Sequence, residues 1–138
     1  MEPVNIEEIK KILNHTLADY PVAFAYVFGS SLSSHRVQES DVDVALGFSK
    51  PVSDGLFYEI FKTLNSRLSL PTEKLDLKNF ADLPLLVRFR VIRDGKLVYL
   101  KDEKIHRQMA VKTIDYYHDE APIIQRSSIL SLKQMASK

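Results

Sequence analysis

The stretch VAFAYVFGS, residues 22–30, and the triplet DVD, residues 41–43, decide the fold of this chain. Val22 to Phe28 is an apolar run of strand length, which predicts a buried β-strand that ends at the pair Gly29-Ser30. We expect Ser30 to about His35 to form a short helix that begins at this Gly-Ser turn.

Two further strands are predicted to carry three acidic residues. Val42 to Leu46 is apolar apart from Asp43, and Asp41 comes directly before it. Because side chains alternate across a strand, Asp41 and Asp43 point to one face and the valine between them to the other. A third acid, Asp76, lies in the strand-like run Glu73 to Leu77. If that strand neighbours the second one, the three carboxylates come together.

The remaining sequence adds helices on either side of these strands. Apolar residues spaced by three or four positions, capping residues and prolines mark where the helices begin and end. Four helices are predicted, from Asn5 or Ile6 to Leu17, from Ser53 or Asp54 to Leu68, from Pro84 to Arg93 and from Asp102 to about His118. Gly47 to Ser53 is predicted to be a loop, and Lys96 to Leu100 a fourth strand. The segment from Ile123 to Lys138 is predicted to be either a further helix or a tail that becomes ordered on a partner. This alternation predicts an α/β or α+β sandwich, in which a mixed sheet is flanked by helices, as a single domain over residues 1–138.

The composition narrows the class of protein. A chain of 138 residues with 45% hydrophobic and 27% charged residues is ordinary for one globular domain with its own core. A net charge of +1 and no basic stripe give no support for direct nucleic-acid binding. The absence of cysteine excludes disulfides and thiolate catalysis. No apolar run has the length of a membrane span or the pattern of a signal peptide, so we expect no membrane partner and a cytoplasmic location.

The three aspartates suit a hard cation. Carboxylates that lie together repel one another unless a cation neutralises them, and burying them among Val and Leu without a partner is costly. An all-oxygen site completed by phosphate and water suits Mg²⁺. We therefore expect Asp41, Asp43 and Asp76 to be metal ligands and catalytic residues, with two Mg²⁺ ions between them.

The Gly-Ser pair suits the phosphate side of such a site. Gly29 lets the backbone approach an anion closely. A helix that starts at Ser30 would aim free N–H groups and the positive end of its dipole at the phosphates, and the serine hydroxyl can donate another hydrogen bond. Gly-Ser alone and Asp-x-Asp alone carry little information, so the prediction depends on their spacing and strand context.

The pair Gly29-Ser30, ten residues, the triplet Asp41-Val42-Asp43 and the later Asp76 together resemble the minimal nucleotidyltransferases, called MNT, of the DNA polymerase β-type superfamily. The resemblance covers roughly Val22 to Leu100. It implies that the Gly-Ser pair binds the nucleotide phosphates and that the three aspartates bind metal. The implied reaction is in-line attack of an acceptor hydroxyl on the α-phosphorus of ATP, with pyrophosphate leaving and Asp76 helping to deprotonate the acceptor.

The resemblance also implies a partner. Many members are MntA-like antitoxins encoded beside a helical HEPN toxin, and members of this kind transfer AMP from ATP to a tyrosine of that toxin. Larger relatives add a helical domain that binds the acceptor, whereas about 38 residues follow Leu100 here. We therefore expect another protein to present the acceptor. The apolar residues of Leu83 to Val91 and the C-terminal helical segment, residues 101–138, are the expected interface, and the assembly is expected to be a homodimer or a hetero-oligomer.

Two other functions stay open. One is nucleotidyl transfer to a small molecule, as in antibiotic resistance, and the other is an antitoxin that acts by contact alone. The identity of the partner and the choice of nucleotide are not fixed by the sequence. Whether His35, Arg36 or Arg88 contacts the nucleotide is also open, with ordinary loop polarity favoured for the first two.

Several conspicuous residues have structural interpretations. Asp82 is expected to be a capping or loop acid, and the phenylalanines downstream of the second strand are expected in the core. The tyrosines and the histidine near the end of the last helix are expected to pack and cap it, and an acceptor role for a tyrosine there is a remote alternative. These residues are Phe57, Phe61, Phe80, Tyr116, Tyr117 and His118. Three arginines are expected to form either a solvated helix face or a basic face beside the site or at an interface: Arg88, Arg90 and Arg93.

Overall fold

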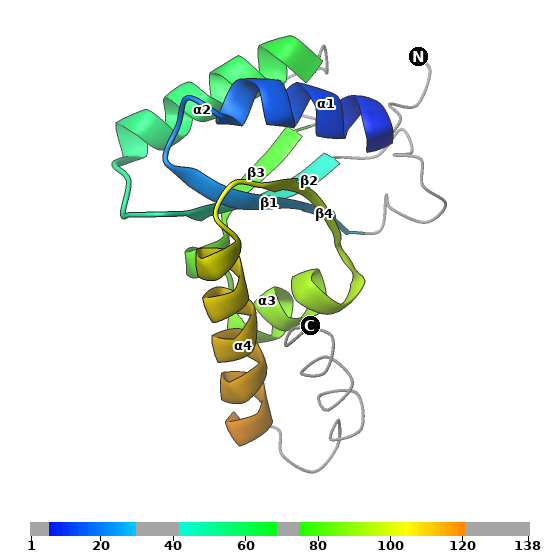
Figure 1. The fold of residues 1–138 in the computed structure, drawn as a ribbon, viewed down its shortest axis with the longest axis vertical. Helices are drawn as coiled ribbons and strands as arrows, with labels where there is room; N and C mark the ends of the chain where they lie inside the picture. The colour runs from blue at the N-terminus through cyan, green and yellow to red at the C-terminus, as the bar shows by residue number, and fades with distance from the viewer. Residues whose placement is uncertain (1–5, 30–41, 69–74, 121–138) are drawn as a thin grey trace.

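A four-stranded sheet in the order β3-β2-β1-β4 forms the centre of the protein (Figure 1). The computed structural model describes residues 6–29, 42–68 and 75–120. The expected short helix at Ser30 to His35 and the segment Ile123 to Lys138 lie outside these described residues, as do Ser30, Asp41, His35 and Arg36.

The sheet is mixed, as predicted. β1 is Val22–Phe28, β2 is Val42–Phe48, β3 is Leu75–Asn79 and β4 is Lys96–Leu100. β1 pairs antiparallel with both β2 and β4, whereas β2 and β3 run parallel. The first and fourth strands have the predicted bounds.

Two strands run further than predicted, and in both cases pairing with a neighbour is the reason. The predicted loop from Gly47 to Ser53 was wrong at its start, because Gly47 and Phe48 still pair with β1. Gly47 lies against the Phe24 ring, where a Cβ would overlap it, so the missing side chain allows close packing rather than ending the strand. β3 likewise reaches Asn79, which pairs with Leu46.

The helices match the predicted ones closely. α1 is Ile6–Leu17, α2 is Asp54–Leu68, α3 is Leu85–Asp94 and α4 is Glu103–Glu120, and a short 3₁₀ helix, η2, spans Phe80–Asp82. The N-terminus of α2 is capped by the Ser53 hydroxyl, which accepts from the Leu56 amide at 3.1 Å. The Asp102 carboxylate caps α4 in the same way, accepting from the Ile105 amide at 3.1 Å.

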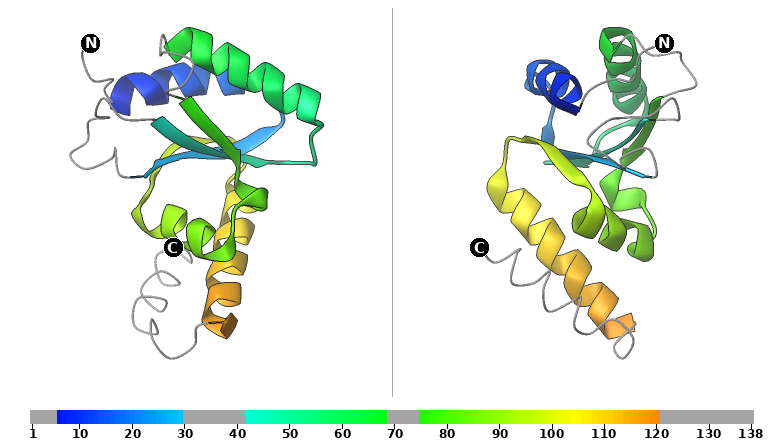
Figure 2. Two further views of the ribbon diagram at one scale, coloured as in Figure 1. Left: turned by 180° about the vertical axis from the view of Figure 1, so that it is seen from behind. Right: turned by 90° about the vertical axis from the view of Figure 1, so that its right-hand side faces the viewer.

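The helices form two layers, one on each face of the sheet (Figures 1 and 2). α1 and α2 cover one face, and the α2 crossover places β3 parallel beside β2. α3 and α4 cover the other face, and α4 extends beyond the sheet (Figure 1). The larger core cluster lies under α1 and α2 and includes the apolar stripe of α1 at Ile6, Ile9, Leu13 and Leu17.

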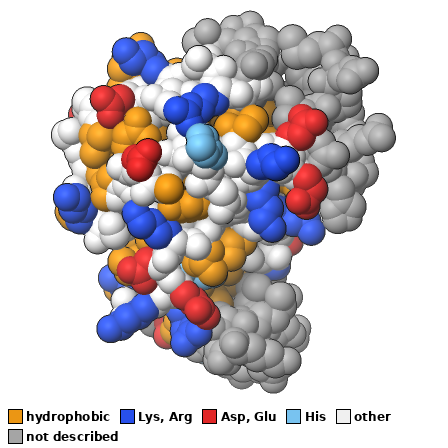
Figure 3. Space-filling view, turned by 45° about the horizontal axis from the view of Figure 1, so that its top comes forward, with side chains coloured by type: hydrophobic (Ala, Val, Ile, Leu, Met, Phe, Trp, Pro, Cys, Tyr) orange, Lys and Arg blue, Asp and Glu red, His pale blue; other side chains and the backbone are white. Residues whose placement is uncertain are grey.

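The surface of the protein is mixed in charge where it can be seen. On the face shown in Figure 3, acidic and basic side chains alternate with small apolar areas and no large area of one sign stands out. No helix among the described residues is both long and apolar enough to cross a membrane.

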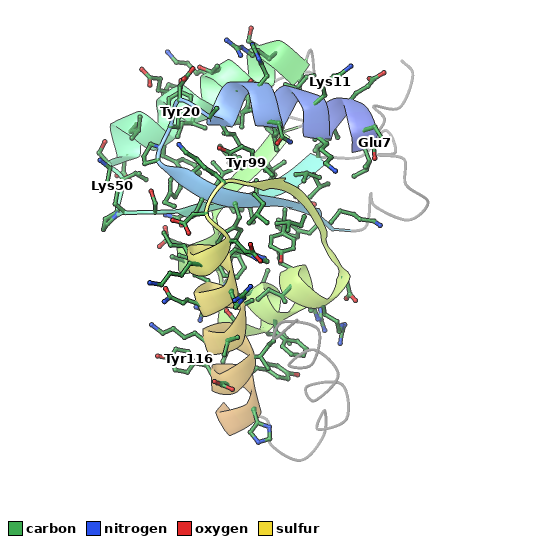
Figure 4. All side chains as sticks on the ribbon, in the orientation of Figure 1. Glu7, Lys11, Tyr20, Lys50, Tyr99 and Tyr116 are labelled. Atoms are coloured by element: carbon green, nitrogen blue, oxygen red, sulfur yellow. The ribbon has the colours of Figure 1, made fainter. Side chains whose placement is uncertain are left out.

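The expected packing residues divide into two groups. Phe80 is buried, and Phe57 and Phe61 pack against the core at its margin, as predicted. Tyr117 stacks on Phe89 with ring centroids 4.0 Å apart, which confirms its packing role. The expectation for Tyr116 was wrong, because this side chain is 45% exposed on the outer side of α4 (Figure 4).

Candidate active site

Three side chains form a row across the sheet on the face that α3 and α4 cover. Phe28 of β1 pairs with Asp43 of β2, and Asp43 pairs with Asp76 of the parallel strand β3. The neighbours Val44 and Leu77 point to the opposite face and are buried in the larger core cluster. The strand with Asp76 therefore lies beside the Asp-x-Asp strand, which is the condition under which the sequence predicts that the carboxylates come together.

Gly29 adjoins this row at the end of β1. Its φ of +98° lies in a region that residues with a side chain rarely adopt. A Cβ at this position would also overlap the Asp43 Oδ2 atom. Glycine is thus required here for two reasons, since the backbone turns sharply and the Asp43 carboxylate lies directly against it.

A pocket of about 670 Å³ opens beside the two carboxylates. This volume falls within the usual range for small-molecule sites. Its walls come from the start of α2, the edge strand β3, η2 and the start of α3. The lining residues are Phe28, Asp43, Val52, Ser53, Asp54, Phe57, Asp76, Leu77, Lys78, Asn79, Asp82, Leu83, Pro84 and Val87.

The paired carboxylates fit a hard divalent cation. Asp43 and Asp76 supply oxygen ligands from the same face of adjacent strands, and both side chains line the pocket. Mg²⁺ is commonly held by one or two carboxylates, with water and substrate phosphate completing its shell. Within residues 6–29, 42–68 and 75–120 no group of three acidic, histidine or cysteine residues could hold a metal. Asp41, the third predicted ligand, lies outside these ranges.

Two residues of the pocket were missed by the sequence interpretation. Lys78 lies two positions after Asp76 on β3, and its Nζ atom is 3.5 Å from the Asp76 Oδ1 atom. The i, i+2 spacing within a strand was the signal that could have found it. Phe28 was assigned only to a strand, and its place beside Asp43 depends on the β1–β2 register.

The other candidates from the sequence lie elsewhere or play smaller parts. Asp82 was expected to be a capping or loop acid, but it is the last residue of the short helix η2 and its side chain also lines the pocket. Arg93 pairs with Asp94 at 2.9 Å and lies over the Phe89 ring. Arg88 is half-buried and is not among the described residues that line the pocket.

A partly buried polar pair lies on the same face of the sheet as the row. The Tyr26 hydroxyl, on the same face of β1 as Phe28, is 2.6 Å from the His106 Nε2 atom of α4. Burial raises the pKa of Tyr26 to about 12 and lowers the pKa of His106 below its ordinary value. Both groups are therefore neutral near pH 7, and their contact fixes α4 to the strand that ends at Gly29.

Solved structures with the same fold include chains of toxin–antitoxin complexes. A chain of a toxin–antitoxin complex with AMP-PNP is 23% identical with a TM-score of 0.64, covering 93% of this chain and 97% of that one. A chain from the complex of tri-AMPylated Shewanella oneidensis HEPN toxin with MNT antitoxin is 22% identical with a TM-score of 0.60, covering 92% and 93%. The MntA–HepT toxin–antitoxin structure gives 22% and 0.59, covering 92% and 94%. At these identities the likeness shows the fold.

Comparison of the sequence with protein-family models identifies the family of the chain. A comparison with curated proteins gives no match. The family model described as polymerase beta, nucleotidyltransferase, matches residues 7–104, which include Gly29, Asp43 and Asp76. That match takes in well over half of the 138 residues, and the chain therefore belongs to the polymerase beta nucleotidyltransferase family.

Proposed function

We propose that this protein is an Mg²⁺-dependent antitoxin that transfers AMP from ATP to a tyrosine hydroxyl of a partner HEPN toxin. The observation that carries the proposal is the row in which Asp43 and Asp76 face each other beside Gly29. Membership of the nucleotidyltransferase family supports the class of reaction. The match to a complex with a tri-AMPylated HEPN toxin supports the choice of AMP and of the partner.

Each residue has a distinct part in this proposal. Asp43 and Asp76, with Asp41, hold the Mg²⁺ ions, and Gly29 with Ser30 leaves room for the triphosphate against the backbone. Bound Mg²⁺ would neutralise the phosphate charge and orient the attacking and leaving oxygens. Asp76 lies toward the open pocket, where it can accept the proton of an acceptor hydroxyl.

The pocket beside the two carboxylates is the proposed binding site for the acceptor tyrosine. Its lining combines the two carboxylates with an apolar wall that includes Phe28, Leu83 and Val87. Such a wall suits the ring of a tyrosine whose hydroxyl reaches the carboxylates. The proposal puts this reaction in the cytoplasm, where ATP and Mg²⁺ are abundant.

The test is a labelling experiment with the full chain. The protein is incubated with Mg²⁺, ATP labelled at the α-phosphate and a HEPN protein from the same genome, starting with any encoded beside this chain. We expect label on the HEPN protein, lost in Asp43→Asn and kept in Asp82→Asn, which removes a carboxylate from the same pocket but not from the row. Mass spectrometry then locates the modified tyrosine.

Other outcomes would favour the alternatives. A tight complex without label, and toxin neutralisation that survives in Asp43→Asn, would replace the proposal with an antitoxin that acts by contact alone. Label on an aminoglycoside in the absence of any protein partner would replace it with a small-molecule nucleotidyltransferase.

We further propose that the partner contacts the outer face of α4. Tyr116 is 45% exposed there, and the Lys112 Nζ atom lies 5.5 Å from its ring centroid (Figure 4). This pair borders a shallow depression of about 430 Å³ that also includes Arg107 and Val111. An exposed aromatic beside basic groups is typical of an interface centre.

The other helical layer supplies a matched control for this surface. Tyr58 of α2 is 58% exposed, and the Lys62 Nζ atom lies 5.2 Å from its ring centroid. We expect Tyr116→Ala to weaken the complex with the HEPN protein and Tyr58→Ala to leave the dissociation constant unchanged. The reverse pattern would move the interface to the α1–α2 layer.

A further inference from the structure

Lys78 is the cation that contacts the acidic row in the described structure. On β3, Asp76 and Lys78 share the face that carries Asp43, while Leu75 and Leu77 are buried on the other. The Lys78 ammonium lies 3.5 Å from the Asp76 carboxylate, and the two side chains are 51% and 46% exposed. The pair is therefore in contact with solvent and able to rearrange.

The described charged residues that line the pocket are mostly acidic, so the contact between Lys78 and Asp76 affects the electrostatics of the whole pocket. The described lining includes four carboxylates, from Asp43, Asp54, Asp76 and Asp82. Lys78 is the one basic side chain among the described lining residues. Two carboxylates that face each other on adjacent strands raise each other's energy, and a nearby ammonium offsets part of that repulsion.

We propose that Lys78 is an internal counter-ion that makes metal binding at this site depend on the nucleotide. The inference rests on the proposed function, in which Asp43 and Asp76 hold the cation. In the metal-free protein the Lys78 ammonium pairs with Asp76 and offsets the carboxylate charge that a bound divalent cation would otherwise offset. A divalent cation must displace this ammonium and then bind beside a positive charge, which weakens its binding when no nucleotide is present.

When a nucleotide is bound, the Lys78 charge is expected to favour binding of the cation instead of weakening it. A triphosphate is strongly anionic, and the four carboxylates among the described lining residues repel it. Once displaced from Asp76, the Lys78 ammonium stays in the same pocket on a flexible stem and attracts the phosphate charge. Lys78 thus disfavours the cation alone and favours cation and nucleotide together. By linkage, the nucleotide must then tighten cation binding by the same factor by which the cation tightens nucleotide binding.

The experiment measures binding rather than turnover. Mn²⁺ is titrated into the full chain by calorimetry, with and without saturating AMP-PNP, and circular dichroism checks that each variant is folded. The variants are Lys78→Gln and Lys78→Met, which remove the charge, and Lys78→Arg, which keeps it. Lys104→Gln makes the same change of net charge at an exposed position of α4 outside the pocket lining.

We expect both neutral variants to bind Mn²⁺ alone about three- to tenfold more tightly, as an ammonium at this range and exposure allows. The gain in Mn²⁺ affinity caused by AMP-PNP should shrink by a similar factor. Lys78→Arg and Lys104→Gln should match the parent. Unchanged or weaker Mn²⁺ binding in both neutral variants would overturn the inference.

Failure of the proposed function gives a different pattern. If Asp43→Asn binds Mn²⁺ as well as the parent does, the row is not the metal site, and the proposed function fails together with the role of Lys78. If Asp43→Asn weakens Mn²⁺ binding while the neutral Lys78 variants match the parent, only the counter-ion inference fails.

Discussion

The two faces of β2 differ although they share one backbone. Val42, Val44 and Leu46 point toward α1 and α2 and are completely or almost completely buried in the larger core cluster. Asp43 points to the other face, where Phe28 and Asp76 flank it and a pocket opens. Alternation along one strand therefore separates the residues that hold the sheet together from those that would carry the chemistry.

This separation explains how strand-borne acids can be tolerated in one sheet. Burying an unpaired polar group in the apolar layer costs about 2–7 kcal/mol of folding free energy, and burying an unpaired carboxylate charge costs more. On the pocket face, solvent and Lys78 reach Asp76. We infer that substitutions on one face should change stability with little effect on the site, and substitutions on the other should do the reverse.

The largest contrast is expected for Asp43→Asn. Removing one ligand carboxylate should lower AMP transfer by about 10³-fold or more, because the Mg²⁺ that would neutralise the charge of the transition state loses a ligand. The same substitution removes repulsion with Asp76, so the melting temperature of the metal-free protein should stay the same or rise slightly. Labelled-ATP assays and thermal melts measure both quantities, and a clear fall in melting temperature would contradict the separation of the two faces.

Leu46→Ala probes the opposite face of the same strand. Leu46 is fully buried, so the free energy of unfolding should fall by about 2–5 kcal/mol through lost burial and a residual cavity. Urea unfolding measures this loss. Mn²⁺ affinity, measured well below the melting temperature, should remain that of the parent. A large change in Mn²⁺ affinity would mean that the two faces are mechanically coupled.

The fold was largely predictable because its signals are local. The apolar run at Val22 to Phe28 and the stripe of α1 give elements with the predicted bounds, since period-two and helical patterns follow directly from how side chains project. Strand ends were less predictable. Gly47 looked like a turn residue, yet its pairing with β1 and the Phe24 ring against it keep it in β2.

The candidate site was predictable in part for the same reason. Asp43 and Asp76 were candidates because acids inside apolar strands are costly without a charged partner, and Gly29 was a candidate because glycine lets the backbone approach an anion closely. Phe28 and Lys78 were not, because their proximity to the acids depends on register and on a charge contact across two positions of an edge strand. The exposure of Tyr116 was missed because its neighbour Tyr117 alone packs on α3, through Phe89.

Gly29→Ala tests the junction between the two faces, where β1 ends. Its backbone φ of +98° should cost an alanine about 1–2 kcal/mol of unfolding free energy, measured by urea titration. The new methyl group would also overlap the Asp43 carboxylate, so Mn²⁺ affinity should fall as well. Gly55→Ala, in the first turn of α2, is the control and should lose neither, because a Cβ there would meet only the Ser53 Oγ atom at 3.9 Å, an ordinary van der Waals contact. Retained Mn²⁺ affinity in Gly29→Ala would show that Asp43 can move without consequence.

An effect on stability alone is expected at the Tyr26–His106 pair, which joins the pocket-side core to α4. Tyr26→Phe leaves a partly buried imidazole nitrogen without its hydroxyl partner and should lower the unfolding free energy by about 1–2 kcal/mol. The loss should appear in urea titrations at pH 7. Tyr99→Phe, also buried, provides a comparison with a hydroxyl outside this pair.

The pH dependence of stability separates the two partners of this pair. Burial lowers the pKa of His106. The imidazole of this residue therefore takes up its proton near pH 6.5 in the unfolded chain, whereas in the folded protein it stays neutral to lower pH. Stability should therefore fall as the pH drops below about 6.5, and His106→Gln should reduce that slope while Tyr26→Phe retains it. Burial raises the pKa of Tyr26 to about 12, so stability should also fall above pH 10. Tyr26→Phe should reduce only this alkaline slope, because the group that ionises there is absent.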